Sequence, residues 1–112
     1  MNLMEGTLDD GTFTGDKVKI TGLRKSHSGP VTLGFRAEDA SISDTAGEIS
    51  APVYSMELLG EATMVTMRAG GTLVAVKAGK EFRANIGDKI NASIPVNICH
   101  LFDAKSGERL EG

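Results

Sequence analysis

Three ionisable residues stand close together in the segment GFRAEDASI, where Arg36 is followed by Glu38 and Asp39. Two adjacent carboxylates could serve as general acid and base, although adjacency in sequence alone is a common accident. The apolar alternation of the preceding run VTLGF breaks at Arg36, however, and residues 37–39 can form a single helical turn before the chain resumes as ASIS. An Arg–carboxylate pair can fix such a turn without doing chemistry. The segment is therefore interpreted as a structural corner, with its charges either available for a contact or simply solvated.

Other residue types that could support catalysis or metal binding form weak patterns. His27 lies between Ser26 and Ser28 in the loop KSHSGP, which lacks the G-x-S-x-G context of an activated serine. Cys99 and His100 are neighbours on an expected strand, where adjacent side chains point to opposite faces, so they do not favour a shared metal ion. We expect no catalytic residue and no metal site, with Cys99 as a small buried hydrophobic residue.

Glycine is abundant, with 14 residues, so a phosphate-binding loop must be considered. The stretch GTFTGDKV has an aspartate at the lysine position of a P-loop, a glycine spacing one residue short and a β context. The stretch AGGTLVAVKAGK fits no better. We therefore expect these residues to bind neither nucleotide nor cofactor and to have no enzymatic activity of their own.

Composition and charge narrow the classes of function further. The 112 residues are expected to form a single domain, 1–112, with 40% hydrophobic and 24% charged residues, as in ordinary folded proteins. The formal charge is −3 and the basic residues are scattered, so nucleic acid is not an expected partner. The chain has no run long enough to enter a membrane, and its start, MNLMEGTLDD, does not resemble a signal peptide. We expect a cytoplasmic location.

Short runs rich in Val, Ile, Thr and Leu alternate with glycine-containing turns, which predicts an all-β sandwich or barrel with little helix. Asp10-Gly11 and Gly70-Gly71 each suit the tight turn of a hairpin. The run 49–59 carries Pro52, so that strand should begin at an edge or be bulged there. The few aromatic residues include Phe35 and Phe102, which lie in apolar runs where core packing is expected.

Three segments follow one another as VTLGFRAEDASIS, EISAPVYSMELLGEATMVTMRAGG and NIGDKINASIPVNICHLFDAKSGERL. Together, over nearly the whole chain, they resemble the TOBE (transport-associated OB-fold) domain at the C-terminus of the ATP-binding subunits of maltose- and sugar-phosphate-type ABC importers. The family patterns are G-[I or F]-R-P-E-x, V-x-x-x-E-x-L-G-x-E-T and H-L-F-D-x-x-T-G-x-R-L. This chain departs from them at Ala37, which replaces the usual Pro, at Ala62, which separates Glu61 from Thr63, and at Ser106, which replaces Thr.

The resemblance implies an OB-like barrel of short antiparallel strands with one short helical turn. It also implies a fragment of a longer ATPase subunit, because MNLMEG resembles the linker that follows the nucleotide-binding domain. ATP and Mg would bind to that other domain. The implied partners are the sister ATPase subunit, the transporter membrane subunits at the cytoplasmic side of the inner membrane, and in some members a phosphotransferase-system regulatory protein.

The expected function is thus an accessory regulatory and dimerisation domain of a sugar importer. The residues expected at its interface are the corner charges and two carboxylates of the second motif: Arg36, Glu38, Asp39, Glu57 and Glu61. Two alternatives stay open. Related barrels of molybdate importers bind small oxyanions, although a Ser-x-Arg-Asn type segment is missing here. A nucleic-acid-binding OB barrel is opposed by the acidic charge and the few aromatic residues.

Overall fold

The computed structural model describes residues 1–23, 28–43 and 45–110, and it confirms the all-β prediction. The elements in chain order are β1 (Asn2–Asp9), β2 (Thr12–Gly15), β3 (Val18–Ile20), β4 (Gly29–Phe35), the 3-10 turn η1 (Ala37–Asp39), β5 (Ser41–Ser43), β6 (Ile49–Leu58), β7 (Ala62–Ala69), β8 (Thr72–Gly79), β9 (Lys89–Ser93), the 3-10 turn η2 (Val96–Ile98) and β10 (His100–Asp103). The turn η1 was predicted. The second turn, η2, was not; it begins after Pro95, whose backbone is extended, with φ −61° and ψ 142°.

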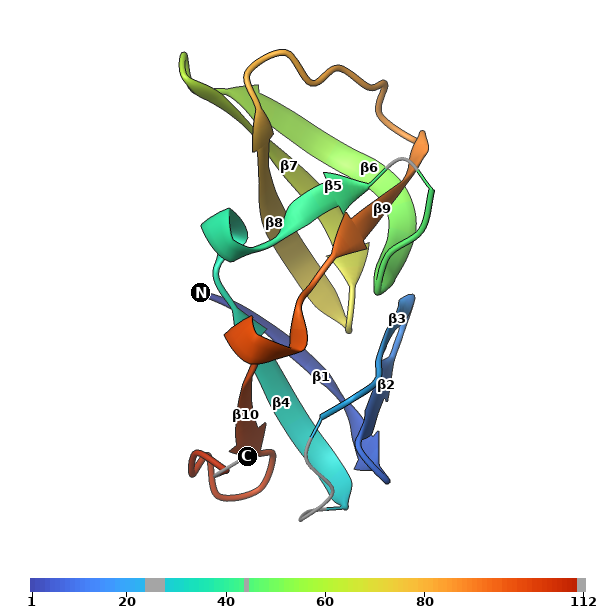
Figure 1. Cartoon of the computed structure of the whole chain (residues 1–112), viewed down its shortest axis with the longest axis vertical. Coiled ribbons are helices and arrows are strands. Elements are labelled where there is room, and N and C mark those ends of the chain that lie inside the picture. Colours follow the sequence, from blue (N-terminus) through green and yellow to red (C-terminus); the bar gives the residue numbers. More distant parts are fainter. Residues whose placement is uncertain (24–27, 44, 111–112) are drawn as a thin grey trace.

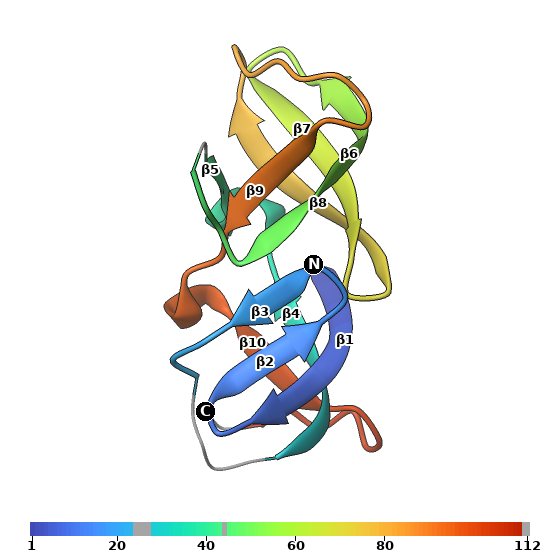
Figure 2. The same ribbon diagram turned by 90° about the vertical axis from the view of Figure 1, so that its right-hand side faces the viewer.

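The strands form two lobes stacked along the long axis of a molecule that measures 40 × 21 × 20 Å (Figure 1). The terminal lobe contains β1 to β4 and β10, and the inserted lobe contains η1 and β5 to β9. The chain enters the inserted lobe at Arg36 and returns through η2. A view from the side shows the two lobes stacked in the same order (Figure 2).

The strands of the terminal lobe pair antiparallel in the order β10-β4-β1-β2-β3, and the pairing continues into the inserted lobe, where Val18 of β3 pairs with Ile49 of β6. The centre of the terminal lobe is Leu33 of β4, which pairs with Met4 on one side and Leu101 on the other. The predicted hairpin between β1 and β2 is confirmed, with φ of 51° at Asp10 and 79° at Gly11. Because both φ values are positive, the tight turn follows the twist of its strands.

The inserted lobe has the order β5-β9-β6-β7-β8, in which β6 pairs with β9 through its first half and with β7 through its second. The register shifts between Val53 and Ser55, directly after Pro52, so the predicted irregularity is a bulge. Pro52 itself is paired with Lys89 inside the strand, and the strand does not begin there. The first and last strands, β5 and β8, contact each other, but no backbone pairing between them is found in the described residues. The sheet is therefore strongly curved, and closure into the expected barrel is not detected.

A single apolar core extends through both lobes. On β7 the expected alternation holds, because Val65 and Met67 are fully buried whereas Arg68 faces solvent. Phe35 is fully buried at the end of β4, as predicted. Phe102 is only half-buried, since it lies on the outer face of the β10-β4-β1 sheet.

The turn between β7 and β8 connects the lobes through its backbone. Gly70 donates its N–H to the Asp16 carbonyl at 2.8 Å and accepts a hydrogen bond from the Glu5 N–H at 3.0 Å. Its φ is 61°, and a Cβ at this position would lie 2.5 Å from Cβ of Met4. Only glycine combines this conformation with so close an approach. The predicted Gly70-Gly71 hairpin is thus confirmed, and it also joins the two lobes.

Candidate interaction surface

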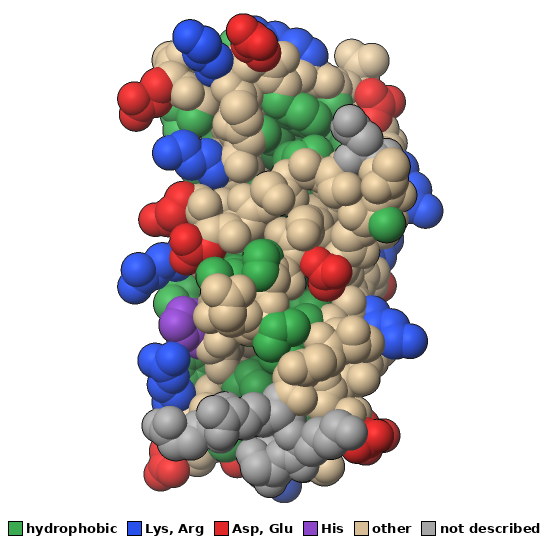
Figure 3. All heavy atoms as spheres, in the orientation of Figure 1, with side chains coloured by type: hydrophobic (Ala, Val, Ile, Leu, Met, Phe, Trp, Pro, Cys, Tyr) green, Lys and Arg blue, Asp and Glu red, His purple; other side chains and the backbone are tan. Residues whose placement is uncertain are grey.

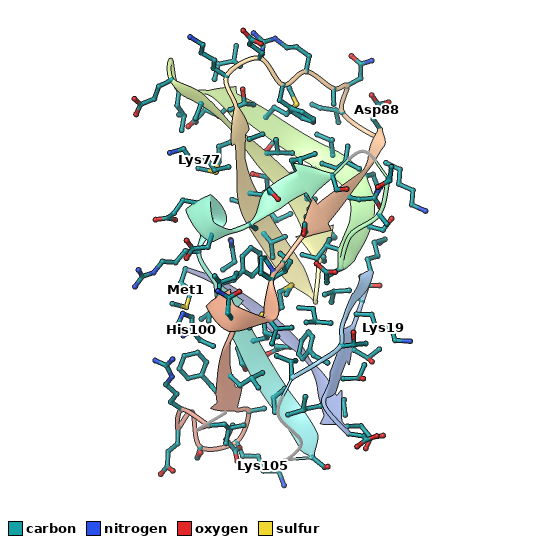
Figure 4. The ribbon with its side chains drawn as sticks, viewed as in Figure 1. Met1, Lys19, Lys77, Asp88, His100 and Lys105 are labelled. Carbon is teal, nitrogen blue, oxygen red and sulfur yellow. The ribbon has the colours of Figure 1, made fainter. Side chains whose placement is uncertain are left out.

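A hollow of about 470 Å³ opens where the two lobes meet. Its walls come from the start of β1, from the corner at η1 and from the strands β7 and β8. The lining residues are Met1, Asn2, Arg36, Ala37, Glu38, Met64 and Ala75. Figure 4 shows Met1 and Lys77, one from each lobe, along the same edge of the molecule.

The segment GFRAEDASI forms the corner that its sequence predicts. Phe35 and Ala40 are buried on either side of η1, and the Asp39 N–H donates to the Arg36 carbonyl at 3.0 Å, which closes the turn. Arg36, Glu38 and Asp39 are all exposed, and no ion pair joins Arg36 to either carboxylate in the described part of the chain. The corner is therefore shaped by burial of its ends and by the backbone, and its charges are directed to solvent.

The five residues expected at an interface are only partly brought together. Arg36 and Glu38 line the hollow, and Asp39 is exposed on the same turn. Glu57 on β6 pairs with Met64 of β7, so it lies one strand from the hollow. Glu61 lies apart from these, because it occupies the exposed turn between β6 and β7 at the far end of the inserted lobe (Figure 1).

Asn2 contributes to the hollow in a way that the sequence did not indicate. Its side-chain Nδ2 donates to the Ala75 carbonyl at 2.7 Å, and its Oδ1 accepts from the Ala75 N–H at 2.9 Å. The side chain thereby takes the place of a neighbouring strand at the edge of β8. The partners are 73 residues apart, so local pattern gives no signal for this pair. Met1 and Met64, the flexible apolar part of the lining, were also not predicted.

Acidic and basic side chains are interspersed over the face in Figure 3, and no continuous basic surface is visible there. On this face the positive charge is therefore not clustered as it is at surfaces that bind polyanions. No group of three His, Cys, Asp or Glu side chains within the described residues could hold a metal ion.

Cys99 is half-buried rather than fully buried, which corrects the expectation. It follows η2, and its Sγ donates to the Pro95 carbonyl at 3.5 Å. Burial raises the pKa of Cys99 to about 11, and the nearby Glu48 carboxylate adds to this effect. The thiol is protonated at neutral pH, which disfavours attack as a nucleophilic thiolate.

The remaining sequence motifs take structural positions or fall outside the described residues. The stretch GTFTGDKV forms β2, a turn and the start of β3, without the helix that a phosphate-binding loop needs. His100 accepts a hydrogen bond at Nδ1 from Arg109 at 2.7 Å, which ties residues 104–110 to β10. Ser26 and His27 lie outside the described residues. In the part of the chain that is described, no helix has the length and apolar character of a membrane span.

Comparison with known proteins gives a consistent group of relatives, although no family model matches the sequence. The chain is 32% identical over 119 residues to the sn-glycerol-3-phosphate import ATP-binding protein UgpC 1 of Rhizobium johnstonii. It is 31% identical over 124 residues to the xylose/arabinose import ATP-binding protein XacK of Haloferax volcanii. It is 28% identical over 116 residues to the uncharacterized ABC transporter ATP-binding protein YcjV of Escherichia coli.

The similarity covers 99% of the chain for the first two proteins and 95% for the third, but in each case only 32% of the relative. The chain thus spans about a third of the length of these relatives, and the matched third is their C-terminal part.

Proposed function

We propose that this chain, which is homologous over nearly its full length to the C-terminal third of ABC importer ATP-binding proteins, is the accessory domain of such a subunit. The main support for this proposal is the extent of the alignment. Almost every residue of the chain aligns, and the alignment is confined to the C-terminal part of each relative. The relatives are named for import of sn-glycerol-3-phosphate and of xylose or arabinose. The solute class that we propose is therefore a sugar or a similarly polar phosphorylated polyol.

ATP and Mg would be bound by the rest of the subunit, and the domain described here would regulate it and help to hold two copies together. Through that subunit it would work with transporter membrane subunits at the cytoplasmic side of the membrane. A phosphotransferase-system regulatory protein is a further partner that the resemblance implies. None of these contacts requires catalysis by the chain itself.

The strand pairing supports an OB-like barrel as the proposed architecture of the inserted lobe. Five strands pair in the order β5-β9-β6-β7-β8, and β5 contacts β8 at the remaining seam. OB folds are five-stranded barrels that are often partly open. Here β5 comes before the other four strands in the chain and would serve as the strand that closes the barrel.

We propose the surface around the hollow as the contact between two copies of the domain. Arg36 and Glu38 carry opposite charges two positions apart on one exposed turn. In a contact with two-fold symmetry the same patch meets itself, so Arg36 of one copy can face Glu38 of the other. Met1 and Met64 supply adaptable apolar area beside them. Attachment to paired ATPase cores would raise the effective concentration of the two domains, so a weak contact is sufficient.

Sedimentation of the full-length ATP-binding subunit tests this proposal. Glu38→Lys should weaken the dimer by about tenfold, because it places like charges across the contact. Glu81→Lys, an equal charge change at an exposed site in the loop between β8 and β9, is the matched control and should leave the dimer unchanged. A dimer that is insensitive to Glu38→Lys, or equally sensitive to both changes, would contradict the assignment of this surface.

A further inference from the structure

A second hollow, of about 360 Å³, lies further along β1 than the hollow described above. One wall comes from β1 and β4, and the other comes from the turn between β7 and β8. The lining residues are Leu3, Glu5, Thr32, Gly70, Gly71 and Thr72. The Glu5 N–H donates to the Gly70 carbonyl at 3.0 Å, and this backbone bond holds the turn against β1. The second hollow is therefore present without any movement of the lobes.

Exposed apolar side chains form a patch beside the second hollow. On β1, Met4 is buried and its neighbours Leu3 and Glu5 are exposed, so both neighbours point outward. Leu3 is 50% exposed and Met1 is 61% exposed. Both side chains lie against Gly34 of β4, which has no side chain of its own, so they form one continuous patch. A continuous apolar patch beside a hollow is typical of a surface that another protein segment covers.

Glu5 gives the second hollow a negative charge. Its carboxylate forms no ion pair within the described residues, and none of the described lining residues is Lys or Arg. Thr32 and Thr72 add hydroxyls, which can donate or accept hydrogen bonds. This lining suits a Lys or Arg side chain, because its aliphatic stem can lie on Leu3 while its charged end pairs with Glu5.

The position of Met1 indicates which protein segment lies nearest to this patch. Figure 1 marks the N-terminus at the junction of the two lobes, at the start of β1. Under the function proposed above, the rest of the subunit precedes Met1, because the relatives are matched through their C-terminal part. Only 32% of each relative is matched, so the unmatched part is about twice as long as this chain. A region of that size joined at Met1 lies within reach of the patch and the second hollow.

We propose, on the basis of that function, that the second hollow holds a Lys or Arg side chain from the ATP-binding part of the same subunit. The basic side chain pairs with Glu5, and apolar residues beside it pack on Leu3. The corner charges Arg36 and Glu38 line the other hollow and stay free for the second copy. The domain thus contacts its own ATP-binding part at the second hollow and its sister domain at the corner.

Cysteine labelling tests this docking by comparing the isolated chain with the full-length ATP-binding subunit. Leu3→Cys reports on the patch. Leu59→Cys is the matched control, because Leu59 is 46% exposed and lies at the far end of the inserted lobe. Alkylation is followed by mass spectrometry of each position's own peptide, so Cys99 does not interfere. Leu3→Cys should react at least about tenfold more slowly in the subunit than in the isolated chain, and Leu59→Cys should change by less than about twofold.

The charge of Glu5 is tested with Thr72→Cys, which keeps Leu3 in place and should also react slowly in the subunit. Adding Glu5→Lys should speed this reaction at least about fivefold, because it places like charges at the contact. Glu5→Gln, which keeps the shape of the side chain, should act in the same direction. Glu81→Lys, an equal charge change in an exposed loop, should leave the reaction slow. A reaction that stays slow with both Glu5 variants would overturn the basic partner.

The occupant is identified by repeating the labelling at a concentration at which sedimentation shows monomeric subunits. Protection of Leu3→Cys that is lost in the monomer would mean that a second copy occupies the second hollow, and the proposal would be wrong. Equal reactivity in the isolated chain and the subunit would also overturn it. Binding of Mg-ATP by the same preparation tests the proposed function separately, so a subunit that binds Mg-ATP but leaves Leu3→Cys unprotected would refute the docking alone.

Discussion

The terminal lobe is assembled from both ends of the chain, whereas the inserted lobe is one continuous segment. In the terminal lobe, β4 pairs with β1 on one side and with β10 on the other, so its sheet is complete only when residues 100–103 are in place. In the inserted lobe all five strands lie between Ser41 and Ser93. Contacts that are nearer in sequence form at a lower entropic cost, so the inserted lobe is expected to order first.

The two lobes also differ in how their edges are covered. The outer side of β10 is paired by the same lobe, through Phe102 and Arg109. The edge of β8 in the inserted lobe is instead bonded by Asn2, which belongs to the other lobe. The hollow and the corner charges lie beside this edge of β8. The region proposed for partner contact is thus the one whose shape depends on both lobes.

The largest loss of stability is expected from a substitution in the core that the two lobes share. Phe13 of the terminal lobe is fully buried, and Phe13→Ala should lower the free energy of unfolding by about 4 kcal/mol, because it removes packing and leaves a cavity. Since the core is continuous across the lobes, hydrogen exchange should accelerate in both of them, and denaturation should remain a single transition. Two separate transitions would instead show that the lobes are independent.

A smaller loss of stability is expected from substitutions in the turn between β7 and β8, which joins the two lobes. Gly70→Ala should cost about 3 kcal/mol, because it combines a positive φ with an added Cβ that would lie 2.5 Å from Cβ of Met4. Gly71→Ala is the matched control: φ there is 77°, but no atom lies within 4 Å of the added Cβ, so the cost should be about 1 kcal/mol. Urea denaturation measures both. Equal costs would mean that the close approach at Gly70 contributes nothing.

The Cys99 thiol should make a still smaller contribution to stability, and this contribution should depend on pH. The pKa of Cys99 is about 11 in the folded chain against an ordinary value of 9.0, mainly through burial and then through Glu48. The unfolded chain therefore releases this proton first, and the stability that the neutral thiol provides below pH 9 should be lost as pH rises towards 11. The difference in unfolding free energy between the chain and Cys99→Ala should shrink over this range. A difference that is constant with pH would show that the thiol ionises alike in both states.

Much of the fold could be predicted because its signals are local. The two glycine-containing hairpin turns and the corner at residues 37–39 each depend on neighbouring residues, and all three are confirmed. The hollow could not be predicted, because it depends on Asn2 meeting Ala75 across 73 residues. Motif resemblance grouped Glu57 and Glu61 with the corner charges, yet neither lines the hollow, because Glu57 lies on β6 and Glu61 in the turn that follows Leu58. The spacing of residues in a motif can therefore indicate the family of a protein without indicating which side chains come into contact.

In the proposed dimer, the corner charges of one copy meet those of a second copy, so exchanging the two charges should preserve the contact. In the full-length ATP-binding subunit, Arg36→Glu and Glu38→Arg are made singly and together, and the dimer dissociation constant is measured by sedimentation. Each single change should weaken the dimer by about tenfold, and the double variant should recover to within about threefold of the original, because the two charges are exchanged in both copies. A double variant as weak as the two single effects added together, or single variants without effect, would contradict the proposed contact.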